Sequence, residues 1–294
     1  MFKNNAIFGI LLMVLATAAL ASKDGIVKTV LDQVDPVQTL WLQFIGTFAV
    51  MALISMPKHG LAAILPTSPV KQFVRGALNV TAISAFFMAL KYIPIADATA
   101  MLLFAPIVVT IMSPFLLSEK IGPLRIIAAA FGFCGVLTIL RPGFSDDLTG
   151  YYFGLTAGIF LGLFFIANRR LAGAQHYLLD ITHNAMMGAL ALTPFMFLIW
   201  EPVPASLNVK MTLIVALAVI GQGFMISSFK FAPAAVISPY SYTMLIFSAL
   251  IGYFVFDTLP DAVSWIGMTL IVGSGLYIAY REQRLMKNHK CAPP

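Results

Sequence analysis

Charged side chains that could handle a small solute stand isolated within long apolar runs of this sequence. Asp24 and Lys28 lie four residues apart, so they share one face if the segment is helical. Such a pair could form a charged rim, or an ion-coupling pair, at the mouth of a path through the protein. The alternative is an ordinary surface pair on a helix, which carries no function.

A second set of residues offers amide and hydroxyl groups within the apolar runs. A polar group in lipid is costly unless it faces a cavity or a partner. Tyrosine adds a flat ring that suits a ring-bearing metabolite, although belts of Tyr at the membrane surface are common. We predict that these residues line a substrate-binding cavity: Gln43, Asn79, Asn168, Asn184, Gln222, Ser227, Tyr240 and Tyr242.

Three groups could gain or lose a proton during a working cycle, namely Asp24, Asp97 and His183. A histidine titrates near physiological pH, but a lone His near a helix end is more often simply solvated. Asp97 lies beside a short turn, where a charge can reach water. The prolines Pro106 and Pro239 predict a bend or break in two apolar segments, where the protein could flex.

The sequence carries no recognisable pattern for catalysis or for a cofactor. Its two cysteines, Cys134 and Cys291, form no disulfide framework or metal motif, and its four histidines are scattered. We predict no catalytic residue, no metal and no cofactor. The formal charge of +6 comes from basic residues scattered between apolar runs, which argues against nucleic-acid binding.

The elements that must position these residues are helices in a bilayer. The chain is 60% hydrophobic and 10% charged, with a mean hydropathy of +0.92, far outside the soluble range. The first apolar segment also resembles a cleavable signal peptide, but we interpret it as a membrane helix because the repeat below gives it a partner. We predict an all-α polytopic membrane protein with ten transmembrane helices. These fall at 6–22, 36–56, 73–91, 96–117, 122–140, 151–168, 181–200, 210–231, 235–256 and 261–280.

An internal repeat divides the ten segments into two groups of five. The stretch "LKYIPIADATA" aligns with "FKFAPAAVISP", so that Lys91 meets Lys230. Because five is an odd number, the second group enters from the opposite side, which makes two inverted five-helix repeats. Inverted repeats are typical of alternating-access carriers, whose binding site lies near the midplane. The predicted units are a first repeat, a second repeat and a cytoplasmic tail, at 1–145, 146–284 and 285–294.

Two pairs of glycines predict close helix contacts. Gly132 and Gly135 lie in the fifth segment, and Gly273 and Gly275 lie in the tenth. Small residues let helix backbones approach each other in a membrane. We expect contact between these two helices or between the protomers of a homodimer.

The distribution of Lys and Arg predicts the orientation. If the N-terminus is cytoplasmic, 13 of the 18 basic residues fall on the cytoplasmic side and 5 on the other. This asymmetry follows the positive-inside rule and predicts an inner-membrane protein with both termini cytoplasmic.

The sequence resembles a known family over essentially its whole length. The first-half resemblance to the EamA-type family of the drug/metabolite transporter superfamily rests on "FFMALKYIPIADATAMLLFAPIVVTIMSPFLLSEKIG" and "GFCGVLTILRPG". The second half resembles it through "FAPAAVISPYSYTMLIFSALIGYFVFDTLPDAVSWIGMTLIVGSGLYIAYRE". The stretch "SKDGIVK" resembles members linked to riboflavin or S-adenosylmethionine transport. Gln43 stands where many relatives have an Arg, so the substrate of those relatives does not carry over directly.

Residues and resemblance together predict a secondary transporter for a small metabolite that is amino-acid-, vitamin- or nucleoside-like. We expect alternating access, driven by proton coupling or exchange, in a bacterial inner membrane. The partners would be the substrate and the lipid bilayer, with no nucleic acid. The alternatives are a facilitative channel or uniporter, and a membrane-embedded enzyme. The sparse polar residues argue against a continuous pore, and the lack of a clustered acid, base or nucleophile argues against an enzyme.

Overall fold

The computed structural model describes residues 2–66, 68–117, 123–140, 148–171, 176–231 and 237–290, and over these ranges the chain is helical with no strand. The long helices alternate with turns and short 3₁₀ segments. In chain order the elements are α1 (Phe2–Lys28), α2 (Pro36–His59), η1 (Gly60–Ala63), α3 (Pro69–Tyr92), α4 (Ile95–Leu102), α5 (Ala105–Leu117), α6 (Pro123–Leu140), α7 (Thr149–Leu171), α8 (Tyr177–Ile199), η2 (Ala205–Leu207), α9 (Asn208–Phe231), η3 (Ser238–Tyr242), α11 (Thr243–Phe256) and α12 (Ala262–Lys290).

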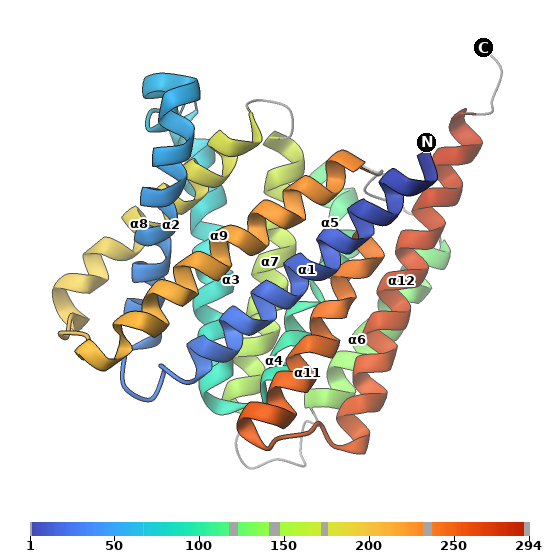
Figure 1. Ribbon diagram of the computed structural model, residues 1–294. Helices are drawn as coiled ribbons and strands as arrows, with labels where there is room; N and C mark the ends of the chain where they lie inside the picture. The colour runs from blue at the N-terminus through green and yellow to red at the C-terminus, as the bar shows by residue number, and fades with distance from the viewer. Residues whose placement is uncertain are drawn as a thin grey trace.

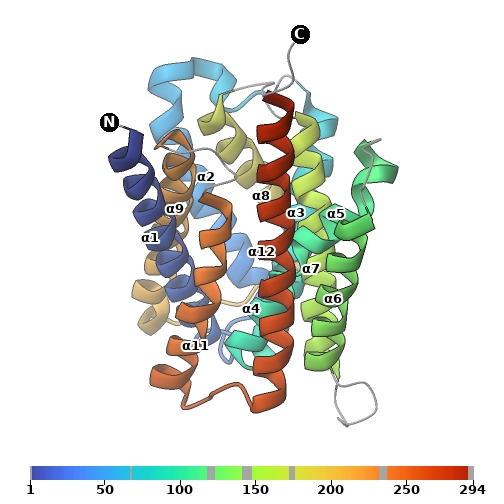
Figure 2. The ribbon, with the colours of Figure 1, turned by 90° about the vertical axis from the view of Figure 1, so that its right-hand side faces the viewer.

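Helix α1 begins and helix α12 ends at the same end of the bundle (Figure 1). We call this the terminal end, and we call the opposite end, where α1 finishes and α2 begins, the distal end. Helix α1 packs against α9 and α11, α3 packs against α7 and α8, and α6 packs against α12, as Figure 2 shows from the side. Helices from the two predicted halves therefore interdigitate.

Several helices are long and apolar enough to cross a bilayer. Seven candidate spans occur among the described residues, and the shorter apolar helices at 126–140, 240–256 and 262–278 add to them. The chain is thus an all-helical, multi-pass membrane protein. Local chemistry explains some helix starts: Pro36 and Pro69 lie in the first turns of α2 and α3, where a missing N–H costs no helical hydrogen bond.

Helix α1 extends further than the sequence predicted. The prediction that 23–28 forms a loop after the first span is wrong, because α1 continues to Lys28. The polar residues at its end are buried by contacts with α3 and α11, which a local pattern does not reveal. Lys23 and Lys28 therefore both lie in the helix rather than in a loop.

The two predicted proline breaks are both present in the backbone. The segment predicted at 96–117 is divided into α4 and α5 by a turn at Leu103 and Phe104, and Pro106 lies in the first turn of α5. Proline has no N–H to donate to the carbonyl of Leu102, so the α4 helix ends there. Pro239 lies in the 3₁₀ segment η3 that leads into α11.

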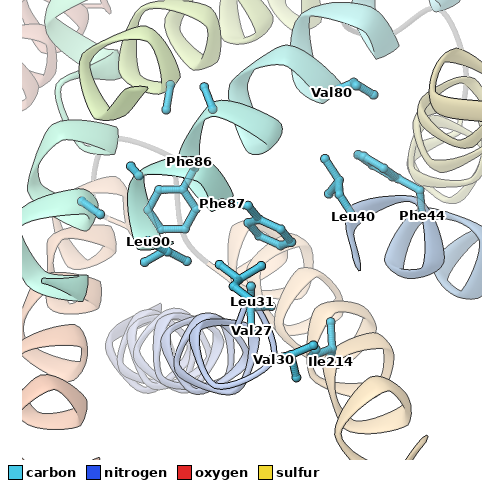
Figure 3. Close-up of a cluster of buried hydrophobic side chains, with 14 of the residues drawn as sticks. Val27, Val30, Leu31, Leu40, Phe44, Val80, Phe86, Phe87, Leu90 and Ile214 are labelled. Atoms are coloured by element: carbon cyan, nitrogen blue, oxygen red, sulfur yellow. The ribbon is translucent and has the colours of Figure 1, made fainter. Parts of the chain in front are cut away.

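A large apolar cluster packs the distal part of the bundle (Figure 3). Val27 of α1 and Leu31 after it lie beside Phe87 of α3, and Val30 lies beside Ile214 of α9. Side chains of α1, α3 and α9 thus meet near the end of α1. In a bilayer, close packing of such side chains against one another holds the helices together.

The predicted glycine contact between α6 and α12 is present at Gly135. A methyl group added there would lie 2.7 Å from the carbonyl oxygen of Gly267, so the two backbones touch. Gly275 instead accommodates the ring of Tyr242, and Gly273 has nothing within 4 Å of an added methyl group. The predicted contact of the helix pair is therefore present at Gly135, whereas Gly273 makes no such contact within this chain.

Candidate functional site

A buried ion pair forms the most unusual polar feature of the helical bundle. Lys23 Nζ lies 2.8 Å from the carboxylate oxygen Oδ1 of its neighbour Asp24. The two residues are only 6% and 1% exposed, and both lie within the candidate membrane span that ends at Lys28. Charges inside a membrane protein cost several kcal/mol even when paired, and they mark functional sites by default.

Aromatic and close helix contacts shield this ion pair. The ammonium of Lys23 lies 5.5 Å from the ring centre of Phe87 on α3, within the range of a cation–π interaction. Gly25 follows Asp24 directly, and a methyl group added to it would lie 2.7 Å from the side chain of Ile251 on α11. The missing side chain at Gly25 lets α11 approach α1 closely, so the pair is enclosed by α3 and α11.

The predicted relationship between Asp24 and Lys28 is not present. Lys28 donates to the backbone carbonyls of Leu90 and Ile93, the second at 2.7 Å, rather than pairing with Asp24. These carbonyls belong to the end of α3 and the turn after it, where backbone acceptors lack helical partners. Lys28 therefore satisfies the end of another helix, and Lys23 takes the predicted place of the cation.

Two predicted cavity residues, Gln43 of α2 and Asn79 of α3, are 6% and 9% exposed. The amide oxygens of Gln43 and of Asn184 on α8 are buried without a hydrogen-bond partner among the described residues. A buried amide oxygen without a partner costs about 1–3 kcal/mol, so it is a natural place for a ligand donor. Helix α8 packs against both α2 and α3, which brings the three helices together, but no hydrogen bond joins these amides within the described ranges.

The predicted residues Gln222, Ser227, Tyr240 and Tyr242 differ in their exposure. Tyr242 is buried, and its hydroxyl reaches the α12 backbone at Gly275. Tyr240 is 37% exposed, and Gln222 and Ser227 are partly buried on α9. Within the described residues the Tyr242 hydroxyl has no partner, and the close fit of its ring against α12 gives it a packing role.

Asn168 lies near the end of α7 and is partly buried. Its neighbour Arg170 donates to the backbone carbonyl of Leu116 at the end of α5. This contact anchors Arg170 at the end of its helix. Asn168 remains a predicted cavity residue, but nothing in the described contacts joins it to Gln43 or to Asp24.

Asp97 is not a solvated turn residue, as the sequence suggested. It lies in the first turn of α4 and is buried, with the Tyr151 hydroxyl of α7 donating to it over a long 3.5 Å contact. A carboxylate is favoured in the first turn of a helix by the N-terminal dipole. The prediction that the Asp97 carboxylate reaches water is wrong, because α7 and α11 pack against α4.

His183 is also buried rather than solvated. It is 1% exposed, and its Nε2 lies 3.0 Å from the carbonyl of Ala62 in η1. One turn earlier on α8, Asp180 accepts from Arg75 of α3 at 2.8 Å. The interpretation of His183 as a surface histidine is therefore wrong, and the two interactions join α8 to α3 and η1 at the terminal end.

Sequence reasoning missed Lys23, Phe87 and the Arg75–Asp180 pair. Arg75 and Asp180 are 105 residues apart, so no local pattern could pair them. In the sequence Lys23 looks like a loop residue, because it follows an apolar run directly. The one available signal was its place beside Asp24 in "SKDGIVK", which suggests a pair of opposite charges at the helix end.

No group of three or more His, Cys, Asp or Glu side chains within the described part of the chain could hold a metal ion. The site therefore offers charge, amide and aromatic contacts.

Comparison with known proteins gives one family over both halves of the chain. Residues 7–141 and residues 148–280 each match the EamA-like transporter family. A relative named as an uncharacterized transporter of Helicobacter pylori strain J99 is 27% identical over 94% of this chain and 96% of its own length.

Two further relatives have named substrates. An S-adenosylmethionine uptake transporter of Rickettsia prowazekii is 25% identical over 78% of each chain. A riboflavin transporter of Rhizobium johnstonii is 26% identical over 96% of this chain and 94% of its own. A solved crystal structure with a TM-score of 0.61 and 21% identity covers 96% of this chain and 99% of the other, which supports the fold alone.

Proposed function

Because the chain belongs to the EamA-like transporter family, we propose that it is a secondary transporter that moves a small metabolite across a bacterial inner membrane by alternating access. The buried Lys23–Asp24 ion pair carries the proposal for the site, since it places both signs of charge inside a candidate membrane span. Paired charges inside a membrane span cost more than apolar residues of similar size would, so packing alone does not account for them. We therefore assign the pair to substrate or ion handling.

The proposed substrate is amino-acid-, vitamin- or nucleoside-like. Relatives named for S-adenosylmethionine and riboflavin support this class, as do the chemical groups near the ion pair. Lys23 suits a carboxylate or phosphate, Asp24 suits an ammonium or a ring N–H, and the Phe87 ring suits a flat surface. In the same proposal the buried amides of Gln43 and Asn184 supply further hydrogen bonds.

The proposed architecture is two inverted five-helix repeats, at 1–145 and 146–284. The two family matches at 7–141 and 148–280 support it, as do the seven candidate spans and three shorter apolar helices, which together number ten. The broken helices around Pro106 and Pro239 occupy corresponding places in the two halves. In an inverted pair, these breaks would lie on opposite sides of a central site.

The proposed orientation puts the terminal end in the cytoplasm. Both α1 and α12 have their outer ends there (Figure 1), so one assignment serves both termini. The distribution of basic residues, 13 on the terminal side and 5 on the distal side, supports this orientation. The tail at 285–294 would then be cytoplasmic.

The proposed energy source is proton coupling or exchange. Asp24, Asp97 and His183 are each buried and titratable, so each is a candidate proton carrier. A facilitative uniporter or channel is the alternative, and a membrane-embedded enzyme is a third reading. The relatives named above are transporters, which supports a function in transport rather than in catalysis.

Purified protein in detergent and in proteoliposomes tests the proposal. We expect S-adenosylmethionine, riboflavin or a related metabolite to raise the melting temperature, and a radiolabelled form of the same compound to enter vesicles. Gln43→Ala should reduce both effects, and Asp24→Asn should abolish uptake. Asn4→Ala, far from the ion pair on α1, is the matched control.

The outcomes separate the alternatives. Uptake that responds to neither a pH gradient nor a membrane potential would replace proton coupling by facilitated diffusion or exchange. Full uptake in Asp24→Asn would remove the ion pair from the mechanism. Uptake that never saturates with substrate concentration would favour a channel.

A further inference from the structure

A groove of about 620 Å³ opens on the side of the bundle between α3 and α5, with α7 as its floor. Its volume falls in the range of pockets that hold small organic ligands, roughly 300–1,000 Å³. Figure 2 shows α3, α5 and α7 gathered at one side of the bundle, away from α1. We propose that this groove holds one anionic phospholipid, with its phosphate at the terminal end and an acyl chain along the groove.

The basic residues of the groove lie together at one end. Lys71 stands in the first turn of α3, and Arg170 stands in the last turn of α7, so both belong to the terminal end. Both side chains are exposed, and neither pairs with a carboxylate within the described residues. Two cations at the polar end of an apolar groove fit the phosphate of a lipid headgroup.

Arg170 is held in place for this role. One of its N–H groups donates to the carbonyl of Leu116 at the end of α5. A guanidinium has five N–H donors, so the others stay available for phosphate oxygens. The bond to Leu116 fixes the guanidinium between α5 and α7, directly beside the mouth of the groove.

The rest of the groove wall is apolar and faces outward. Val70 is 74% exposed and Val74 is 52% exposed, while Leu78 and Leu163 continue the wall deeper along α3 and α7. Outward apolar side chains on a membrane protein face acyl chains. The wall therefore suits the hydrocarbon chain of the molecule whose phosphate meets Lys71 and Arg170.

The groove is separate from the proposed transport site. Val74 and Phe87 are 13 residues apart on α3, which corresponds to about 20 Å along the helix. Phe87 faces the ion pair of α1, whereas Val74 lines the side groove. The lipid site consequently makes no use of Lys23 or Asp24.

Native mass spectrometry of the full chain with phosphatidylglycerol and phosphatidylcholine of identical acyl chains tests this inference. We expect one phosphatidylglycerol to be retained at activation energies that strip phosphatidylcholine. Lys71→Gln and Arg170→Gln should each lower that retention about fivefold, as expected for loss of one basic residue near an anionic headgroup. Lys91→Gln, an exposed lysine at the other end of α3, is the matched control and should change nothing.

A second variant tests the apolar wall. Leu163→Asp should weaken retention of both lipids while leaving Lys71 and Arg170 in place. Equal retention of the two lipids by the wild-type chain would overturn the proposal. It would also be overturned if Lys91→Gln lowered phosphatidylglycerol retention as much as Lys71→Gln and Arg170→Gln do, since the effect would then be one of overall charge.

Discussion

The hydroxyl of Thr99 on α4 donates to the hydroxyl of Ser248 on α11 over 2.9 Å, and both side chains are completely buried. The two residues are 149 positions apart and lie in the two predicted repeats. Thr99 lies on α4, which ends just before Pro106. Ser248 lies on α11, which follows the η3 segment that contains Pro239. This single bond therefore joins the two helices that we expect to flex.

Thr99→Val should destabilise the protein by about 1–3 kcal/mol, because it leaves the buried Ser248 hydroxyl without its donor. Ser248→Ala should cost less, since the Thr99 hydroxyl can turn to a carbonyl of its own helix. The double variant should recover most of the loss. A thermal or denaturant double-mutant cycle measures this coupling, and additive losses would show that the two hydroxyls do not depend on each other.

Lys23→Met and Asp24→Asn should each lower stability by about 3–5 kcal/mol, because each leaves a buried charge without its partner. The double variant Lys23→Met/Asp24→Leu removes both charges and should regain the lost stability. Substrate uptake should remain abolished in all three variants. The comparison of melting temperature with uptake separates a structural pair from a functional one, and uptake in the double variant would assign the pair to structure alone.

Gly275→Ala should destabilise the protein by about 1–3 kcal/mol through overpacking. The added methyl group would lie 1.5 Å from the Tyr242 hydroxyl, and the buried ring has little room to move away. Gly273→Ala, two residues earlier on α12, meets nothing within 4 Å and should be neutral or slightly stabilising. Melting temperatures of the two variants decide the point, and similar values would mean that the ring adapts freely.

Pro106→Ala should join α4 and α5 into one continuous helix, because alanine restores an N–H for the carbonyl of Leu102. We expect a higher melting temperature and a slower transport rate. Pro114→Ala is the matched control, since Pro114 lies inside α5 without ending it. An unchanged rate in Pro106→Ala would remove this break from the transport cycle.

Sequence patterns predicted the helices well because the membrane imposes one strong rule on them. Each predicted apolar segment falls on helical structure where the chain is described, and the breaks near Pro106 and Pro239 follow from the missing N–H of proline. The end of α1 was missed for a physical reason. Lys23 and Asp24 look like loop residues until α3 and α11 are seen to enclose them.

The candidate site was predictable only in part. The cost of polar groups in lipid correctly indicated that Gln43 and Asn79 would be buried. The same argument could not identify the hydrogen-bond partners of buried polar side chains. The Arg75–Asp180 and Thr99–Ser248 interactions join segments that are more than 100 residues apart in the sequence. It also mistook the surroundings of His183 and Asp97, whose burial depends on η1 and α7.

Helix α12 has 29 residues, which at 1.5 Å per residue make a rod about 43 Å long. The hydrocarbon core of a bilayer is only about 30 Å thick, so the last part of this rod projects into water. The end of this helix would therefore hold a reporter enzyme or fluorescent protein fused after Lys290 away from the bilayer surface. Such a fusion would reveal the compartment of the terminal end in living cells without disturbing the ion pair on α1.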